Sequence, residues 1–521
     1  MPSRHALTWT ALLPLMAALA PAGLHAQQST EVPHFRVDTH VVVLDVVVTD
    51  KKGNTVNNLA RDDFRVTEQK QPQTIRSFEP PSMHLLKAAD TGNLGDSGVR
   101  NFGESPLTIL LLDEMATRFE DMAYARFQVT KYLNRQPEHL TQPTMLVVLT
   151  NKKMIMLVDW TQNKQDIVKA VASRHPDVPY RITGDPQAAA ELLSDSLAAL
   201  TQIAQATAGE HGRKNVIWLG HGFPALSTDT LDPQSTDIIT NALHVTAKIL
   251  TDARLTLYTI DPAGLPAYAS ASATDDNPDA DSAMELSDPD DMSFGALTDL
   301  TGGHAFKLRN DLDVAVDTSE RAGANYYTLS YVPENNVYDG KYRSIHVQIV
   351  NHPELMANTR AGYYADTDKK TTPDMVAFEL TKAATAQLPY TGLVISATNF
   401  HSAKPNAGAF TLHIEPHGLS WSNQENGDAR AEFTIAESEQ DNHGNIVSYT
   451  VKELATTARA AQVNQVENAP LGYSVPVELN PRAVKLRIIV RDAANGRIGT
   501  ADFGPEALQQ IHFIGKSKRS K

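Results

Sequence analysis

The spacing of apolar side chains changes along the chain, and each change predicts a different kind of structure. In residues 31–80, apolar side chains form continuous or alternating runs such as VVVLDVVV, and turn signals such as TDKKGN separate them. β-Branched runs bounded by turn residues are typical of strands. We therefore predict a strand segment that is too small to bury its own apolar face and needs a partner sheet.

The middle of the chain follows a helical period that alternates with short apolar runs. Residues 81–104 are rich in Gly, Ser, Asp and Pro and indicate a linker, and residues 105–323 then alternate strands with amphipathic helices. This alternation predicts a doubly wound α/β domain with a mainly parallel sheet that helices cover on both faces. Its strands are predicted at 107–112, 145–149, 154–158, 215–219, 254–260 and 304–308.

An acidic stretch interrupts this domain at residues 270–292, which contain many Asp and no Lys or Arg. Asp275, Asn277 and Asp279 alternate as in the start of a calcium loop. However, Ala280 and Leu286 stand where such a loop needs Gly and Glu. We interpret the stretch as an acidic surface insertion.

The period returns to two after the α/β domain, which predicts strands again. We expect residues 324–366 to pair with the N-terminal strands, so that the α/β domain is inserted into one β-sandwich. Residues 374–515 predict a separate C-terminal β-sandwich, with a helix at 455–466 between its strands, and residues 516–521 form a basic tail.

The first 26 residues have the layout of a signal peptide: Arg4 in a short polar start, then an apolar run, then small residues. An uncleaved anchor is the alternative interpretation. No other segment has the apolar length of a membrane span, so we predict an exported chain, periplasmic or extracellular, with no transmembrane segment after cleavage. The chain has no cysteine, which excludes disulfides.

Charge limits the class of partner. The formal net charge is -15, and no basic face is visible apart from the tail, which argues against nucleic acid as a partner.

Candidate chemistry begins at Asp113, which directly follows the apolar run of the first α/β strand. In open α/β sheets, ligands bind at the carboxyl ends of the strands, so Asp113 is placed where a metal ligand would be useful. The alternative is that Asp113 caps the helix that begins nearby, and that Glu114, Glu120 and Asp121 only favour the N-terminal dipole of this helix.

Seven short segments together resemble the von Willebrand factor A-related proteins of acidobacteria. They cover residues 37–365 and include LTILLLDEMAT, GRKNVIWLGHGFPAL, RLTLYTIDPAGL and NYYTLSYVPENNVYDGKYRSIHVQI. The resemblance implies a von Willebrand factor A fold, an adhesion architecture that holds a divalent cation, usually Mg²⁺, at the carboxyl edge of the sheet. A partner's acidic group then completes the six oxygen ligands of the cation.

The metal-ion-dependent adhesion site that this resemblance implies is degenerate. Asp113 and Thr117 match its first motif, but Met115 stands where a Ser oxygen is expected, and a thioether is a poor ligand for Mg²⁺. Thr183 matches the Thr of the second loop. His221 replaces the last Asp, and its imidazole suits zinc or copper better than Mg²⁺. Glu114, Gly220 and Gly222, together with Met115, are expected to flank the site at a partner-binding edge.

The function expected from these observations is binding. We predict a non-catalytic exported protein that binds a protein or another macromolecule at this edge, with or without Mg²⁺ or another divalent cation. The alternative is a metal-independent structural or envelope-assembly scaffold whose β domains make the contacts. A third hypothesis is an enzyme whose catalytic residues are far apart in the sequence and meet only in the fold. No catalytic motif such as G-x-S-x-G, a P-loop or H-E-x-x-H occurs in the sequence.

Overall fold

The computed structural model describes most of the chain from Val41 onward. The described residues are 41–86, 102–151, 153–175, 186–223, 232–265, 294–335, 337–365, 371–404, 407–415, 418–424, 426–463, 466 and 469–508. The predicted signal peptide, Thr183, the acidic insertion, the basic tail and most of the first linker therefore lie outside them. Within the described residues, no helix is long and apolar enough to cross a membrane.

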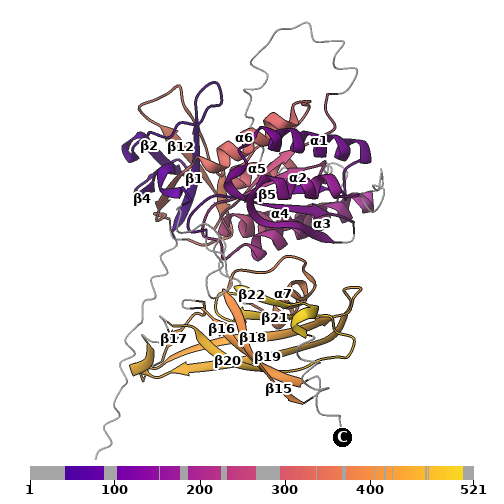
Figure 1. Ribbon diagram of the computed structural model, residues 1–521. Coiled ribbons are helices and arrows are strands. Elements are labelled where there is room, and N and C mark those ends of the chain that lie inside the picture. Colours follow the sequence, from indigo (N-terminus) through magenta and orange to yellow (C-terminus); the bar gives the residue numbers. More distant parts are fainter. Residues whose placement is uncertain are drawn as a thin grey trace, which may run out of the picture. The chain divides into compact units, whose positions relative to one another are not determined.

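The protein combines an α/β domain with β-sheet domains, as the periodicity predicted (Figure 1). The α/β domain has a six-stranded sheet in the order β10-β9-β8-β5-β6-β7, in which β7 alone runs antiparallel to its neighbour. The strands are β5 (Leu107–Asp113), β6 (His139–Leu149), β7 (Met154–Asn163), β8 (Lys214–Leu219), β9 (Leu255–Ile260) and β10 (Ala305–Phe306).

Helices bury both faces of this sheet, and the side chains of β5 show how. Ile109 and Leu111 belong to a core cluster with one set of helices, whereas Leu110 and Leu112 belong to a cluster with the other set. The first set is α3 (Pro186–Ala206), α4 (Pro233–Asp252) and α5 (Phe294–Thr301); the second is α1 (Phe119–Arg135), α2 (Lys164–Ser173) and α6 (Leu312–Ala324). Burial on both faces explains why the strands are apolar without alternation.

The N-terminal strands and the strands after the α/β domain form one sandwich of two four-stranded sheets. Their orders are β13-β1-β11-β4 and β14-β12-β2-β3, so strands far apart in the sequence lie side by side (Figure 1). The register pairs Leu44 with Leu329 and Val66 with Val347. The strands are β1 (Val42–Thr49), β2 (Phe64–Glu68), β3 (Gln71–Gln73), β4 (Ile75–Glu79), β11 (Tyr327–Tyr331), β12 (Tyr342–Ile349), β13 (Met356–Asn358) and β14 (Gly362–Tyr364).

Alternation along β1 explains how this sandwich is built. Val42, Leu44 and Val46 point into the shared core, whereas Val41 and Val43 stay exposed. Short 3₁₀ turns, η1 (Arg61–Asp63) and η2 (Pro81–His84), flank the strands β2 to β4. Each group of strands is too small to bury its apolar face alone, and the two groups bury their apolar side chains against each other in this sandwich.

The C-terminal segment is a second sandwich, with two differences from the expected elements. One sheet has the order β15-β16-β20, and the other contains β17, β18, β21 and β22, with β19 paired to β18. The strands are β15 (Ile395–Lys404), β16 (Ala407–Ile414), β17 (Ser422–Asn423), β18 (Ala429–Gln440), β19 (Ile446–Ala458), β20 (Leu471–Glu478), β21 (Lys485–Asp492) and β22 (Ile498–Phe503).

The first difference is the predicted helix at 455–466, which is wrong over its first turn. β19 continues to Ala458 because β18 pairs with it along its whole length. The 3₁₀ turn η6 (Ala460–Gln462) follows, and the described residues Val463 and Val466 are helical, in agreement with the later part of the prediction. The second difference is a helix that was not expected, α7 (Pro373–Thr385), which precedes the strands. Thr372 caps it, and Pro373 occupies its first turn.

Candidate functional site

The predicted site residues that the structure describes meet at the carboxyl edge of the α/β sheet. Asp113 is the last residue of β5, and His221 follows β8 after one glycine. Asp261 directly follows β9, the next strand of the sheet. Parallel strands end at the same edge, so these side chains converge although they are far apart in the sequence.

The Asp113 carboxylate is buried and fully engaged by N–H donors. Its Oδ1 accepts hydrogen bonds from the backbone N–H groups of Met115 (3.1 Å) and Ala116 (2.9 Å). Its Oδ2 accepts from Trp218 Nε1 and from the Gly222 N–H, both at 3.1 Å. Burial raises the pKa of Asp113 above its usual range, although the four hydrogen bonds oppose this shift. Asp113 therefore fastens the turn after β5 to β8 and to the loop beyond it.

Asp113 is not the cap of α1, which was the alternative interpretation. The helix begins at Phe119 with Arg118 at the N-cap position, and no side chain accepts a capping hydrogen bond there. The other part of that interpretation agrees with the structure, because Glu120 and Asp121 lie in the first turn, at the positive end of the helix dipole.

Thr117 and the glycines close the same corner. Thr117 is buried, and its Oγ1 accepts a hydrogen bond from the His221 backbone N–H at 3.1 Å. A Cβ at Gly220 would lie 2.5 Å from both Asp113 Cβ and Thr117 Oγ1, so only glycine fits this position. Gly222 has a φ of +63°, which also favours glycine.

The His221 imidazole lies between two carboxylates. Its Nδ1 is 2.8 Å from Asp261 Oδ1, and its Nε2 is 3.1 Å from Asp121 Oδ2. Asp121 also pairs with Arg118, whose Nε is 3.0 Å away. Burial alone would lower the pKa of His221, but the hydrogen bonds and charges of Asp261 and Asp121 outweigh it, and the pKa is raised. This geometry favours an imidazolium that joins the first turn of α1 to the loops after β8 and β9.

Glu114 and Met115 support the edge from inside and do not form its surface. Glu114 is buried and makes a bidentate ion pair with Arg174, at 2.7 and 3.2 Å. Met115 is part of the core cluster. The expected contact of these two side chains with a partner does not agree with their burial. Gly220 and Gly222 are buried as well.

These residues do not fit a divalent cation. A carboxylate has about four lone-pair directions, and at Asp113 four N–H donors use them. Met115 is turned into the core, and each imidazole nitrogen of His221 faces a carboxylate. Among the described residues, no group of three or more His, Asp or Glu side chains is arranged to hold a metal ion.

The outer surface of this edge carries apolar side chains that the sequence pattern did not single out. Phe119, Leu265 and Leu308 are 66, 53 and 63% exposed. They lie on the segments that follow β5, β9 and β10, the strands that end at this edge. The available signal was their position, because each comes within a few residues of the end of a predicted strand. Asp261, directly after the predicted strand 254–260, could have been found in the same way.

Comparison of the chain with models of known protein families and with curated proteins finds no match.

Proposed function

We propose that the protein is an exported, non-catalytic binding protein that docks a protein partner on the carboxyl edge of its α/β sheet. The observation that carries the proposal is the exposure of Phe119, Leu265 and Leu308 on three separate segments of this one edge. Large apolar side chains exposed at the same edge of a sheet can supply the contact area of an interaction site. We refer to these three residues as the apolar edge.

Hydrogen bonds hold the segments that carry the apolar edge. The Tyr124 hydroxyl of α1 donates to the Asn310 carbonyl at 2.5 Å, and the Leu265 N–H donates to Asn310 Oδ1 at 3.2 Å. The Asp261 N–H donates to the Phe306 carbonyl at 2.9 Å. Since these segments are already ordered, they would lose little conformational entropy when a partner binds.

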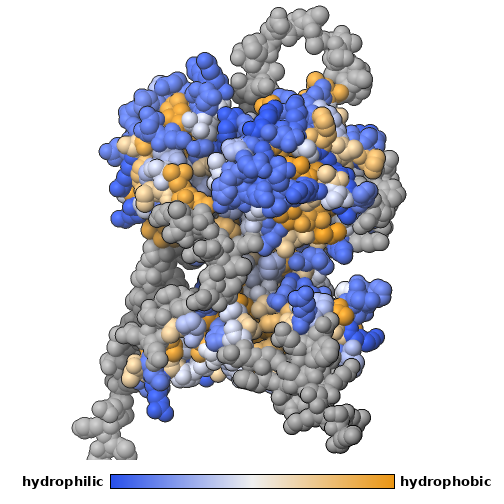
Figure 2. All heavy atoms as spheres, viewed as in Figure 1, coloured by the Kyte–Doolittle hydropathy of each residue, from blue (hydrophilic) through white to orange (hydrophobic). Residues whose placement is uncertain are grey.

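The proposal takes its metal-independent form because the Asp113 oxygens and the His221 nitrogens are engaged within the protein. The rigid Asp113 and His221 contacts then serve to shape the edge, and the apolar side chains supply the contact area. Figure 2 shows apolar residues at the surface of the α/β domain, interspersed with charged ones, as is usual for non-obligate interfaces.

We extend the proposal to the fold family, a von Willebrand factor A-like domain. Two features support it: the doubly wound sheet, and the placement of Asp113, Thr117 and His221 at one edge. In this proposal the binding site lies where a von Willebrand factor A domain has its adhesion site, and internal hydrogen bonds to Asp113 take the place of the metal ion.

The test compares partner capture by three forms of the protein. The wild type, the triple variant Phe119→Ser, Leu265→Ser, Leu308→Ser, and the control Phe378→Ser are immobilised, and proteins from the exported fraction of the source cells are quantified on each. Phe378 is also largely exposed but lies on α7. We expect the triple variant to lose about tenfold or more of the captured partner, and chelation with EDTA to change nothing.

Two results would contradict the proposal: capture by the triple variant at the wild-type level, or loss of capture on chelation. Circular dichroism of the triple variant provides the folding control. Serine at three exposed positions should leave the free energy of unfolding within about 0.5 kcal/mol per site.

A second candidate function, a scaffold that assembles through its C-terminal sandwich, is favoured by one observation. β19 is thirteen residues long and, among the described residues, pairs only with β18. Ile446 and Val451 are exposed on it. Long edge strands with apolar side chains readily add a further strand. Val451→Lys should block such pairing, so loss of capture in this variant alone would favour the scaffold.

A further inference from the structure

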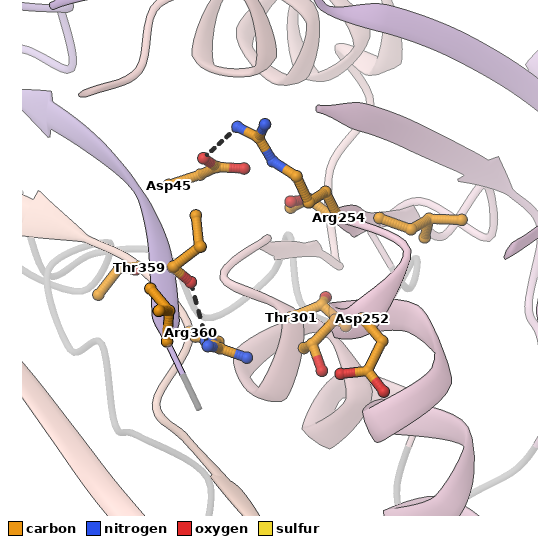
Figure 3. Close-up of a pocket in the computed structure, with 11 residues that line it drawn as sticks. Asp45, Asp252, Arg254, Thr301, Thr359 and Arg360 are labelled. Carbon is orange, nitrogen blue, oxygen red and sulfur yellow. Dashed lines mark hydrogen bonds and ion pairs between the residues drawn. The ribbon is translucent and has the colours of Figure 1, made fainter. Parts of the chain in front are cut away.

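A cavity of about 270 Å³ lies between the N-terminal sandwich and the α/β domain. Its walls come from the outer side of β1, the end of α4, the start of β9, and the segment that joins β13 to β14. Two arginines line it: Arg254 from the α/β domain, and Arg360 from the sandwich. Figure 3 shows Arg254 with Asp45 on one side of this cavity, and Arg360, Thr359, Thr301 and Asp252 around the rest.

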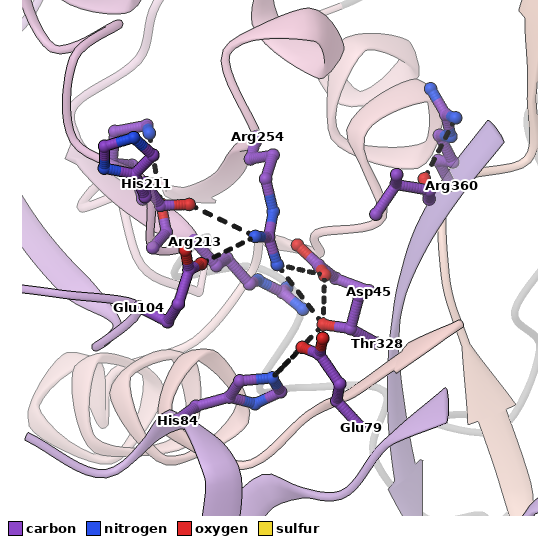
Figure 4. A network of polar contacts seen from close by, with 12 residues as sticks. Asp45, Glu79, His84, Glu104, His211, Arg213, Arg254, Thr328 and Arg360 are labelled. Carbon is purple, nitrogen blue, oxygen red and sulfur yellow. Dashed lines mark hydrogen bonds and ion pairs between the residues drawn. The ribbon is translucent and has the colours of Figure 1, made fainter. Parts of the chain in front are cut away.

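The charge of Arg254 is compensated within the protein. Its Nη2 donates to Asp45 Oδ1 at 2.8 Å, and its Nη1 lies 3.3 Å from Glu104 Oε2 and donates to the His211 carbonyl. Figure 4 shows these contacts continuing through Thr328 to His84 and Glu79. Arg254 is therefore a structural residue that joins the two domains.

Arg360 differs from Arg254 because no carboxylate of the described residues lies within ion-pair distance of it. Its one hydrogen bond runs from Nη2 to the Val43 carbonyl, at 3.0 Å. Its Nε and the Oγ1 of neighbouring Thr359 are buried without a partner among the described residues. The nearby Asp252 is engaged by Lys248, 2.5 Å away. Burial lowers the pKa of Arg360 from its usual value, so the cost of holding this charge is not fully offset.

The ring of Tyr363 offsets this cost only in part. Arg360 Cζ lies 5.8 Å from the ring centroid, where a cation–π contact contributes modestly. A guanidinium is planar and matches the two oxygens of a carboxylate, so a carboxylate is the group that best completes its surroundings.

The other lining residues define the ligand more closely. Val41, just before β1, and Val43 of β1 are 53 and 39% exposed, and with Leu255 they give the cavity an apolar wall. Asp45 and Asp252 also line the cavity, and their negative charges disfavour a dianion such as phosphate. The cavity volume, about 270 Å³, is just below the range of about 300–1,000 Å³ that drug-sized ligands occupy, so only a small ligand fits.

We propose that this cavity binds a monocarboxylate with a short apolar body, its carboxylate on Arg360 and its body against Val41 and Val43. The ligand is either a free small acid or the carboxyl-terminal residue of a peptide, since both present the same group. This site is separate from the apolar edge, so it adds a second ligand to a protein whose proposed function concerns another surface.

The experiment is a calorimetric titration of the purified protein with benzoate and hexanoate. Benzamide serves as the uncharged analogue and inorganic phosphate as the dianion. A short peptide ending in two valines, with a free or an amidated carboxyl terminus, distinguishes the two sources. Three variants are compared: Arg360→Gln, Val41→Trp, which fills the cavity but keeps the guanidinium, and Arg65→Gln, an exposed arginine of β2 as control.

We expect saturable binding of benzoate or hexanoate and none of benzamide. Arg360→Gln and Val41→Trp should each weaken binding at least about tenfold, and Arg65→Gln should not change it. Tighter binding of the free peptide than of the small acids would identify a chain terminus as the natural source. The proposal is overturned if no acid or free peptide binds, if both cavity variants bind as the wild type does, or if phosphate binds more tightly than benzoate.

Discussion

The imidazole of His221 lies between Asp261 and Asp121, so its protonation contributes to stability in a defined pH range. The folded-state pKa of His221 is raised above its ordinary value of 6.5. A raised pKa stabilises the fold fully below the unfolded value, and this contribution is lost as pH rises through the folded value. Burial alone would raise the pKa of Asp261, but the hydrogen bonds from His221 and the Ala263 N–H and the nearby positive charges together lower it, so the carboxylate remains charged in mildly acidic solution.

We therefore predict that His221→Gln lowers the free energy of unfolding by about 1 kcal/mol near pH 5.5. The loss should shrink above pH 7 as the wild-type imidazole deprotonates. Urea unfolding at a series of pH values measures it, with His346→Gln, an exposed histidine of β12, as control. A difference that grows with rising pH would contradict the assignment.

Asp113 shows at the same scale what local sequence can and cannot indicate. Its place after a buried strand predicted that it lies at the carboxyl edge. Its role, however, depends on donors from Trp218 and Gly222, more than a hundred residues away. The spacing of residues in the sequence does not predict such contacts. The hydrogen bond from the His221 N–H to Thr117 Oγ1 likewise joins residues that are far apart in the sequence. The site could therefore be located from the sequence, while the engagement of its oxygens could not.

Among the elements, the strands and helices of the α/β domain were located by the apolar period, because both faces of each strand are buried. The predicted strands at 145–149 and 154–158 were too short, however, since β6 already begins at His139 and β7 continues to Asn163. α7 was missed although Thr372 and Pro373 give an ordinary helix start. The end of β19 was misjudged for a different reason. Residues 455–458 have no strong strand pattern of their own, and their conformation is imposed by hydrogen bonds to β18.

The start of α7 supplies a prediction at this scale. Thr372 Oγ1 accepts a hydrogen bond from the Met375 N–H at 3.3 Å. Thr372→Ala removes this cap and should lower the free energy of unfolding by about 1 kcal/mol. Thr371→Ala, the exposed neighbour, is the matched control and should change it by less than about 0.5 kcal/mol. Urea unfolding followed by circular dichroism makes the comparison, and equal losses in both variants would exclude the capping role.

For the whole molecule, the pair Asp45–Arg254 connects the sandwich to the α/β domain. The two side chains are largely buried, and burial alone would raise the pKa of Asp45, but Arg254 and Arg213 lower it. The stability that this pair supplies is therefore present above the ordinary pKa of 3.8 and lost as pH falls through the folded value.

We predict that Asp45→Asn and Arg254→Gln each lower the free energy of unfolding by about 2 kcal/mol or more at neutral pH. The double variant should lose less than the sum, because the second change removes the unpaired charge that the first one leaves. The exposed pair Arg430–Glu432 is the control, and Glu432→Gln there should cost at most about 0.5 kcal/mol. Strict additivity at Asp45 and Arg254 would show that they are not coupled.

The insertion of the α/β domain into the sandwich determines when the first sheet can form. Val42 of β1 pairs with Tyr331, and Phe64 of β2 pairs with Ile349. During synthesis, the N-terminal strands must therefore wait for nearly three hundred further residues before their partners exist. Until then, the valine-rich β1 presents a free strand edge, which is prone to aggregate. Folding of the α/β domain shortens the distance that the strands must then bridge. It brings the two ends of the insertion, at β4 and β11, next to each other.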